Sequence, residues 1–124
     1  CGCGYQAAVL GKLSKEVYSV ERIAALLPKA RGNLRAAGSR NVRVRHADGY
    51  NGLADLAPFD AIAIGAAAPE IPQALTGQLS DGACLVFPLG SQLQRLFLVE
   101  KCGDLLKRAE FDGVRFVPLL PGVI

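Results

Sequence analysis

The chain has 124 residues, of which 51% are hydrophobic, so it is apolar enough to fold as one domain spanning 1–124 and not to be a disordered tail. The formal net charge is +3, and five arginines fall between residues 31 and 45 with no interleaved aromatic residue to stack on a base, so we expect no nucleic-acid partner. No apolar run approaches the roughly 20 residues that cross a bilayer, so we expect no membrane partner either.

The first residues and the cysteines indicate the cellular compartment and the oxidation state of the thiols. The sequence contains no Met and begins with neither the basic nor the apolar region of a signal peptide, so we interpret its start as a truncation. None of the four cysteines forms a CxxC motif or a Cys/His pair at metal-binding spacing. We therefore expect reduced thiols, a cytoplasmic location and no metal site.

The first half of the chain alternates helical and extended patterns. Apolar residues recur three or four positions apart over residues 5–13 and again over 23–37, which predicts two helices. Pro28 lies near the start of the second helix, so we expect that helix either to begin there or to kink there. Short β-prone runs follow the helices, at residues 17–20 and 42–45, and predict two strands.

The second half repeats this alternation and then changes to consecutive strands. Residues 61–64 form a continuous apolar run, which is typical of a strand covered on both faces. A helix over 71–79 and a second buried strand over 83–88 follow. Two longer runs, 92–100 and 105–117, flank a turn signal and predict an antiparallel pair. The order predicts an α/β fold with a doubly wound, mostly parallel sheet that carries a C-terminal antiparallel hairpin.

Ligands of such sheets bind where the strands end, so the loops after the strands are the candidate site. Gly2 and Gly4 precede the first helix, where glycines let the backbone approach a ligand closely. Glu21 ends the next strand, at a place where nucleoside-binding folds hold the ribose hydroxyls with an acid. On spacing alone, the alternative that Glu21 is a surface acid paired with Arg22 or Lys15 stays open, although the ribose-binding role is favoured.

Two later loops add further candidates. Asp48 and Gly49 follow the expected strand at 42–45. The Asp48 carboxylate could accept a hydrogen bond from an adenine amino group at this position, or it could simply belong to a turn. Small residues and two prolines over 65–72 form either a tight apolar pocket floor or close packing. His46 is the only histidine, and no nucleophile, base and orienting residue stand at a recognisable spacing. Hydride transfer and methyl transfer therefore both remain open, whereas the phosphate-binding GxxxxGK[ST] loop of phosphoryl transfer is absent.

Five segments in the right order closely resemble the protein-L-isoaspartate O-methyltransferases, which are class I S-adenosylmethionine-dependent methyltransferases. They are GCGYQAAVL at 2–10, VYSVERI at 17–23, APFDAI at 57–62, AAAPEIP at 66–72 and VRFVPL at 114–119. The resemblance covers nearly the whole chain and displaces the hydride-transfer hypothesis. It implies a Rossmann-like sheet whose first strand is missing here, so the strands at 17–20 and 61–64 are expected to have unpaired edges.

The resemblance also implies roles for particular residues. Gly2 and Gly4 would approach the methionine part of the cofactor, S-adenosyl-L-methionine, and Glu21 would hold its ribose hydroxyls. Asp48 and Gly49 would meet the adenine. The full cofactor-binding set is Gly2, Cys3, Gly4, Tyr5, Gln6, Glu21, Arg22, Asp48 and Gly49. The implied acceptor pocket consists of Ala66, Ala67, Pro69, Val117, Pro118 and Leu119.

The implied reaction moves the cofactor methyl to the α-carboxylate of L-isoaspartyl or D-aspartyl residues in damaged proteins and peptides, as a repair step. A carboxylate, with a pKa near ~4, is already a nucleophile at neutral pH, so no catalytic side chain is expected. The resemblance implies a monomer in the full-length form, and we expect the 124-residue piece alone to be marginally stable, aggregation-prone and inactive. The alternatives are a related methyltransferase with another acceptor and an inactive remnant of the fold.

Overall fold

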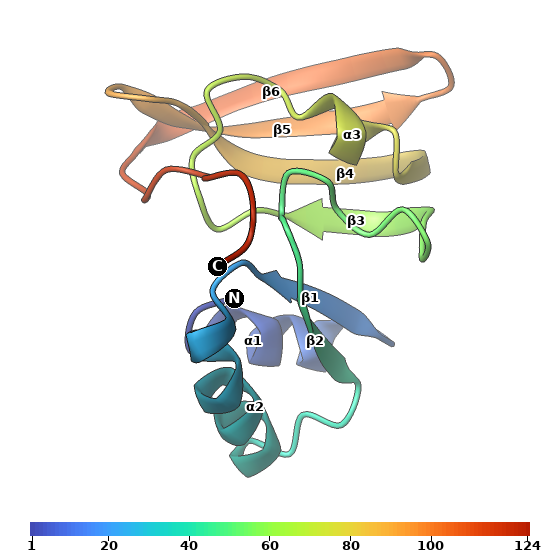
Figure 1. The fold of residues 1–124 in the computed structure, drawn as a ribbon. Coiled ribbons are helices and arrows are strands. Elements are labelled where there is room, and N and C mark those ends of the chain that lie inside the picture. Colours follow the sequence, from blue (N-terminus) through green and yellow to red (C-terminus); the bar gives the residue numbers. More distant parts are fainter. The chain divides into compact units, whose positions relative to one another are not determined.

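Six strands and the helices between them fall into two units in the computed structural model, which describes all of residues 1–124 (Figure 1). One unit comprises Cys1–Gly49 with Pro121–Ile124, and the other comprises Tyr50–Leu120. The first contains a two-stranded sheet and the second a four-stranded sheet. The predicted α/β class is confirmed, with parallel pairs in both sheets and an antiparallel hairpin at the C-terminal end. None of the helices has the length and hydropathy needed to cross a membrane.

The unit Cys1–Gly49 with Pro121–Ile124 begins with a helix and alternates as predicted. Its elements are α1 (Tyr5–Leu13), β1 (Val17–Glu21), the 3-10 turn η1 (Ala24–Leu26), α2 (Leu27–Ala36) and β2 (Val42–His46). Pro28 lies in the first turn of α2, where its missing N–H costs no helical hydrogen bond, so the helix begins there and does not kink. Gly38 ends the helix in the left-handed region, with φ +71°. The Ser39 and Gly38 N–H groups donate to the Leu34 and Arg35 carbonyls, at 2.9 and 3.1 Å, a Schellman motif.

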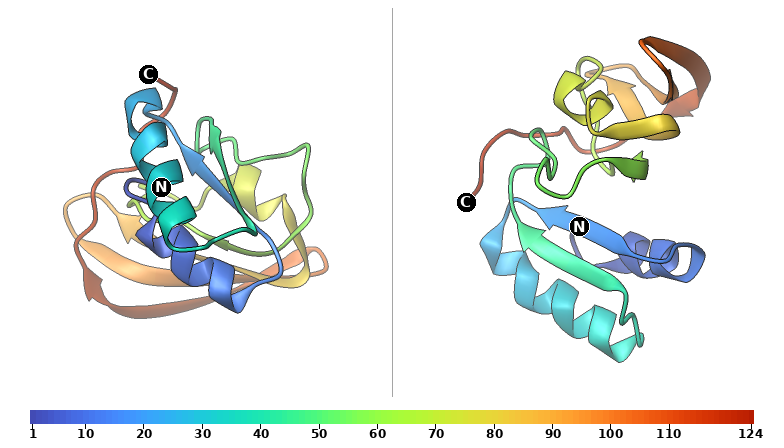
Figure 2. Two further views of the ribbon diagram at one scale, coloured as in Figure 1. Left: turned by 90° about the horizontal axis from the view of Figure 1, so that it is seen from below. Right: turned by 90° about the vertical axis from the view of Figure 1, so that its right-hand side faces the viewer.

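The core of this unit lies between the helices and the two strands. Leu27, Leu34 and Val44 pack with Ala7, and α2 runs beside β2 in both views of Figure 2. Strands β1 and β2 pair in parallel from Val17–Val42 to Glu21–His46. Because the two strands end at the same level, the residues that follow them share one edge of the sheet.

The unit Tyr50–Leu120 is built around a four-stranded sheet of order β3-β4-β5-β6. Its elements are β3 (Phe59–Ala63), α3 (Gln73–Thr76), β4 (Leu79–Gly90), β5 (Gln94–Cys102) and β6 (Leu105–Val114). Helix α3 is a single turn, shorter than the predicted 71–79, because Pro72 precedes it and the chain enters β4 at Leu79. Strand β6 ends at Val114, so residues 115–117, which were predicted to extend it, lie outside the strand.

The core of this second unit lies on one face of the sheet. Leu85 and Phe87 of β4 and Val99 of β5 are fully buried, and the Phe87 and Phe97 rings meet edge to face with centroids 6.0 Å apart. The prediction that residues 61–64 are covered on both faces is wrong, because Ala61 and Ala63 are exposed. Strand β3 hydrogen-bonds to β4 alone, and only Ile62 and Ile64 of this run pack against the core.

Candidate functional site

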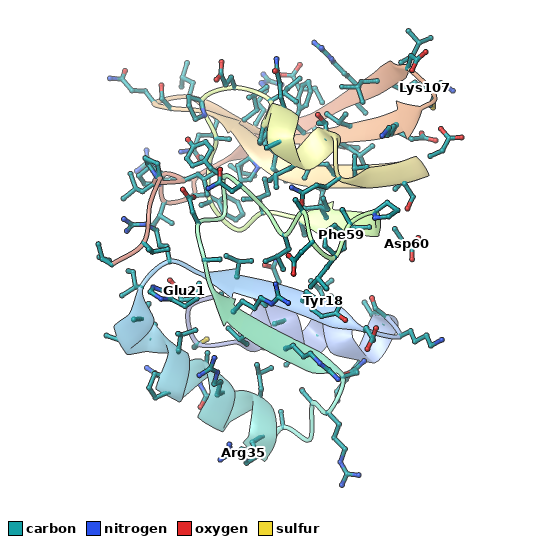
Figure 3. The ribbon with its side chains drawn as sticks, turned by 45° about the vertical axis from the view of Figure 1, so that its right-hand side comes forward. Tyr18, Glu21, Arg35, Phe59, Asp60 and Lys107 are labelled. Atoms are coloured by element: carbon teal, nitrogen blue, oxygen red, sulfur yellow. The ribbon has the colours of Figure 1, made fainter.

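Glu21 lies at the carboxyl end of β1 with its side chain nearly buried, and Figure 3 shows it at the opposite end of the strand from Tyr18. Its Oε2 accepts a hydrogen bond from the Gly2 N–H at 2.8 Å, and its Oε1 accepts one from the Ile23 N–H at 2.9 Å. The N-terminal ammonium of Cys1 lies 3.2 Å from Oε2. The predicted acid and the predicted glycine loop are therefore in direct contact.

The surroundings of Glu21 keep it ionised. Burial on its own raises the pKa of this carboxyl, but the hydrogen bonds from Gly2 and Ile23 and the nearby ammonium outweigh burial, so the pKa lies below its ordinary value. A carboxylate has about four acceptor positions. Glu21 therefore retains acceptor capacity for further hydroxyl donors.

The glycines of the first loop have the backbone freedom that this position requires. Gly2 and Gly4 have φ values of +56° and +88°, which residues with a Cβ rarely adopt. A Cβ on Gly4 would also lie 3.2 Å from both the Ala30 carbonyl oxygen and the Leu34 side chain. Gly4 thus allows the loop to pass close to α2.

Asp48 and Arg22 follow β2 and β1, and both contact the segment Pro121–Ile124. The Gly122 N–H donates to Asp48 Oδ2 at 2.8 Å, and Arg22 Nε donates to the Gly122 carbonyl at 3.1 Å. The Ala47 N–H donates to the Glu21 carbonyl at 3.1 Å, which links the ends of the two strands. The structure therefore places Glu21, Arg22 and Asp48 at one edge of the same sheet, with half-buried Gly49 next in the chain.

The remaining predicted cofactor residues are less involved in this network. Tyr5 and Gln6 begin α1 with exposed side chains, that of Tyr5 being 76% exposed. The Cys3 carbonyl accepts a hydrogen bond from Asn33 Nδ2 at 2.9 Å, while the residue itself is exposed. All nine predicted cofactor residues belong to the unit Cys1–Gly49 with Pro121–Ile124.

The predicted acceptor residues all lie in the other unit, around a cavity of about 360 Å³. Four of the six line it, whereas Ala66 and the 69%-exposed Val117 do not. The cavity is lined by Tyr50, Ala67, Pro69, Gly90, Ser91, Gln94, Phe116, Pro118 and Leu119.

Backbone hydrogen bonds build the walls of this cavity from distant segments. The Ala67 N–H donates to the Val117 carbonyl and the Leu119 N–H donates to the Ala67 carbonyl, both at 2.8 Å. On the other side, the Ala68 N–H donates to the Pro88 carbonyl at 2.9 Å. Residues 67–68 are thus clamped between the end of β4 and the segment 117–119.

A second and larger cavity, of about 510 Å³, lies between α2 and the start of β2. None of the predicted site residues lines it, and its aliphatic lining residues are Leu34, Val42 and Val44. Four arginines line it: Arg31, Arg35, Arg40 and Arg43. Its size alone does not relate it to the chemistry that the sequence indicates. The two candidate regions are therefore the strand ends of the unit Cys1–Gly49 with Pro121–Ile124 and, separately, the smaller cavity of the unit Tyr50–Leu120.

Comparison with known proteins decides the family. The family model described as "Protein-L-isoaspartate(D-aspartate) O-methyltransferase (PCMT)" matches residues 1–123. The chain belongs to this methyltransferase family. A protein-L-isoaspartate O-methyltransferase from Azoarcus sp. (strain BH72) is 53% identical over 121 residues, which cover 98% of this chain and 56% of that protein. The chain therefore spans about half the length of the curated relatives it matches.

Solved structures of methyltransferases agree with this assignment. A structure of a protein-L-isoaspartate O-methyltransferase superposes with a TM-score of 0.86 at 29% identity and covers 94% of this chain and 39% of its own. A putative member from Plasmodium falciparum, solved in complex with S-adenosyl-L-homocysteine, has a TM-score of 0.75 at 25% identity, covering 85% of this chain and 52% of its own. The predicted Rossmann-like methyltransferase fold is confirmed.

Sequence reasoning missed part of the lining of the smaller cavity. Five lining residues were not predicted as acceptor residues, and of these only Phe116 lies within a quoted motif: Tyr50, Gly90, Ser91, Gln94 and Phe116. Tyr50 directly follows Gly49, so its place after a strand-end loop was a usable signal. Gln94 lies inside the predicted strand run 92–100, and no local pattern connects it to a segment 22 residues away.

Proposed function

We propose that the full-length protein is a protein-L-isoaspartate (D-aspartate) O-methyltransferase that methylates the α-carboxylate of L-isoaspartyl and D-aspartyl residues. Family membership over residues 1–123 supports the reaction class. The observation that carries the proposal is the contact between buried Glu21 and Gly2 at the end of β1, because an acid beside a glycine loop is what a nucleoside cofactor requires there.

The cofactor in this proposal is S-adenosyl-L-methionine, and the residues present fit it. Glu21 would accept hydrogen bonds from the ribose hydroxyls, while Gly2 and Gly4 would lie against the methionine part and Asp48 and Gly49 against the adenine. When bound, the cofactor supplies an electrophilic methyl group on a positively charged sulfur. The other proposed contacts come from Cys3, Tyr5, Gln6 and Arg22.

The acceptor cavity suits a substrate that brings its own nucleophile. Its walls are mainly apolar, and they would surround the acceptor carboxylate, limit its access to water and orient it. The carboxylate needs no base at neutral pH because its pKa is near ~4. In this proposal the acceptor is held by Ala67, Pro69, Pro118 and Leu119, whereas Ala66 and Val117, which do not line the cavity, only flank these residues in the chain.

The proposed partners are isoaspartyl-containing proteins and peptides. We propose that the enzyme repairs aged proteins in the cytoplasm and that it works as a monomer. The neighbouring backbone nitrogen then attacks the methyl ester without the enzyme, methanol leaves and a succinimide forms, and hydrolysis of that ring returns part of the material to normal aspartyl linkage.

The test uses the full-length protein, recovered with the coding sequence that precedes Cys1. We expect it to transfer a labelled methyl from S-adenosylmethionine to an isoaspartyl hexapeptide and not to the matched aspartyl hexapeptide. Glu21→Gln should weaken S-adenosylhomocysteine binding in calorimetry by roughly tenfold to a hundredfold, because a hydrogen bond to a charged group is lost, and the exposed Glu16→Gln is the matched control.

Each failure of this test has a distinct meaning. Binding of S-adenosylhomocysteine without methylation of the isoaspartyl peptide would indicate a related methyltransferase with another acceptor. Absence of both would indicate an inactive remnant of the fold. Equal effects of Glu16→Gln and Glu21→Gln on binding would contradict the proposed role of Glu21.

A further inference from the structure

Gln94 connects the start of β5 to a segment that has already left the sheet. Its Oε1 accepts a hydrogen bond from the Phe116 N–H at 2.7 Å, and its Nε2 donates to the Phe116 carbonyl at 3.0 Å. Backbone pairing between β5 and β6 stops at Gln94 and Val114. The side-chain amide therefore acts as an extra peptide group and continues the pairing beyond the last strand residue.

Gln94 lines the acceptor cavity, but its hydrogen-bonding groups are largely committed. The second N–H of Nε2 is used as well, because Nε2 also donates to the Ser91 carbonyl at 3.2 Å. A glutamine has two N–H donors in its side chain, so none remains for a bound substrate. Gln94 is thus suited to hold protein segments in place and not to bind the acceptor itself.

The segment that Gln94 holds forms a wall of the cavity. Phe116 is followed by Val117, Pro118 and Leu119, and this stretch pairs with Ala67 at 2.8 Å on both sides. Tyr50 adds one more attachment, since its hydroxyl donates to the Leu119 carbonyl at 3.3 Å. Gln94 and Tyr50 therefore attach the two ends of the wall, and Ala67 attaches its middle.

We propose that Gln94 is a positioning residue for methyl transfer, which holds residues 116–119 in the register that shapes the isoaspartyl pocket. This inference rests on the proposed function and extends it, because it assigns acceptor affinity to a side chain outside the predicted acceptor set. Loss of the clamp loosens the acceptor wall, whereas Glu21 and Gly2, which hydrogen-bond each other within the other unit, keep their contact.

The test compares Gln94→Ala, Gln94→Glu and the control Gln92→Ala in the full-length protein. Gln92 is exposed in the same β4–β5 turn. Gln94→Ala should raise KM for an isoaspartyl hexapeptide roughly tenfold, because two hydrogen bonds to Phe116 are lost, with kcat and KM for S-adenosylmethionine within about twofold of wild type. Gln94→Glu keeps an acceptor for the Phe116 N–H, but it turns a carboxylate toward the Phe116 and Ser91 carbonyl oxygens and adds a negative charge to a cavity that takes a carboxylate, so its peptide KM should rise at least as much as that of Gln94→Ala.

Amide hydrogen exchange gives a second readout that does not depend on turnover. Exchange at Ala67 and Leu119 should become faster in Gln94→Ala and stay unchanged in Gln92→Ala. The proposal is overturned if exchange and peptide KM both match wild type, or if kcat and both KM values worsen together in Gln94→Ala and in Gln94→Glu. If wild type methylates no isoaspartyl peptide, the proposed function fails and the role of Gln94 in acceptor affinity fails with it. Faster exchange in Gln94→Ala would then still show that the clamp itself exists.

Discussion

At the scale of single residues, the candidate site depends on how a carboxylate is kept charged while nearly buried. Glu21 achieves this mainly with backbone N–H groups, which are fixed by the turn after β1 and by the glycine loop, and the Cys1 ammonium adds a smaller contribution. The hydrogen bonds that Glu21 accepts connect the glycine loop to the end of β1, and they are strongest when Glu21 is ionised. The lowered pKa of Glu21 therefore means that its ionised form stabilises the fold.

This linkage predicts a pH dependence of stability. The folded-state pKa of Glu21 lies below its ordinary value of 4.5, so the stabilisation is fully present above pH 4.5 and is lost as the pH falls through the folded-state pKa. Urea unfolding measured between neutral pH and pH 3 should show a steeper loss of stability in wild type than in Glu21→Gln. Glu16→Gln is the control, because Glu16 is exposed, and it should follow wild type. Parallel curves for wild type and Glu21→Gln would contradict the prediction.

At the scale of elements, local sequence determines most of what the structure contains. Helices α1 and α2 and strands β1 and β2 follow from apolar spacing, Pro28 and Gly38, all of which act within a few residues. The errors lie where distant partners decide. The exposure of Ala61 and Ala63 depends on whether a distant segment covers their face of β3, and the early end of β6 depends on Ala67 pairing with residues 117–119.

Some residues of the candidate site can likewise be predicted from the local sequence, and others depend on distant partners. The strand-end residues Gly2, Glu21 and Asp48 are predictable because parallel strands bring their carboxyl ends to one edge. Gln94 was not predictable, because its role appears only when two segments 22 residues apart meet. The side chain of Gln78 behaves similarly, since it accepts from the Leu53 N–H at 2.9 Å and donates to the Asn51 carbonyl at 2.8 Å.

Two glycines with positive φ allow local and tertiary effects to be separated. Gly38 and Gly52 have φ values of +71° and +62°, but a Cβ on Gly38 meets open space, whereas one on Gly52 would collide with Gln78 and Leu75. We predict that Gly38→Ala costs about 1 kcal/mol of stability from backbone strain alone. Gly52→Ala should cost roughly 1–3 kcal/mol more, because the loop and its glutamine clamp must shift. Denaturant unfolding measures the stability loss in both variants, and equal losses would contradict a structural role for the Gln78 side chain beside Gly52.

At the scale of the whole chain, the strand edges and the charge distribution matter most. Strands β1 and β3 each hydrogen-bond to one neighbour, so each has an edge of unpaired N–H and C=O groups that can pair with another chain. We predict that the 124-residue chain associates as its concentration rises, in sedimentation velocity, while the full-length protein stays monomeric. A monomer at all concentrations, with a cooperative melt that S-adenosylhomocysteine raises, would contradict this expectation.

Charge is distributed unevenly between the two units. Nine of the 14 basic residues, but only three of the 11 acidic ones, belong to the unit Cys1–Gly49 with Pro121–Ile124. The arginines of the larger cavity, including Arg35 near the end of α2, are part of this excess, whereas Lys107 lies on β6 of the other unit (Figure 3). Such a field attracts acidic polypeptides more strongly than basic ones.

The net charge of +3, to which the basic unit contributes the excess, predicts that acidic isoaspartyl peptides are preferred as substrates. At low salt, KM for an acidic peptide should be lower than for a basic peptide with the same isoaspartyl centre, and the difference should shrink as salt shortens the screening length to about 8 Å near 0.15 M. Replacing Arg35 and Arg43 together with Gln should reduce the preference by about two- to threefold, because both are exposed members of the basic excess. Lys107→Gln, which removes one exposed charge from the unit Tyr50–Leu120, is the control and should leave the preference in place.

A preference that is independent of salt, or that survives the double substitution unchanged, would mean that peptide choice is decided within the acceptor cavity and not by the surrounding field.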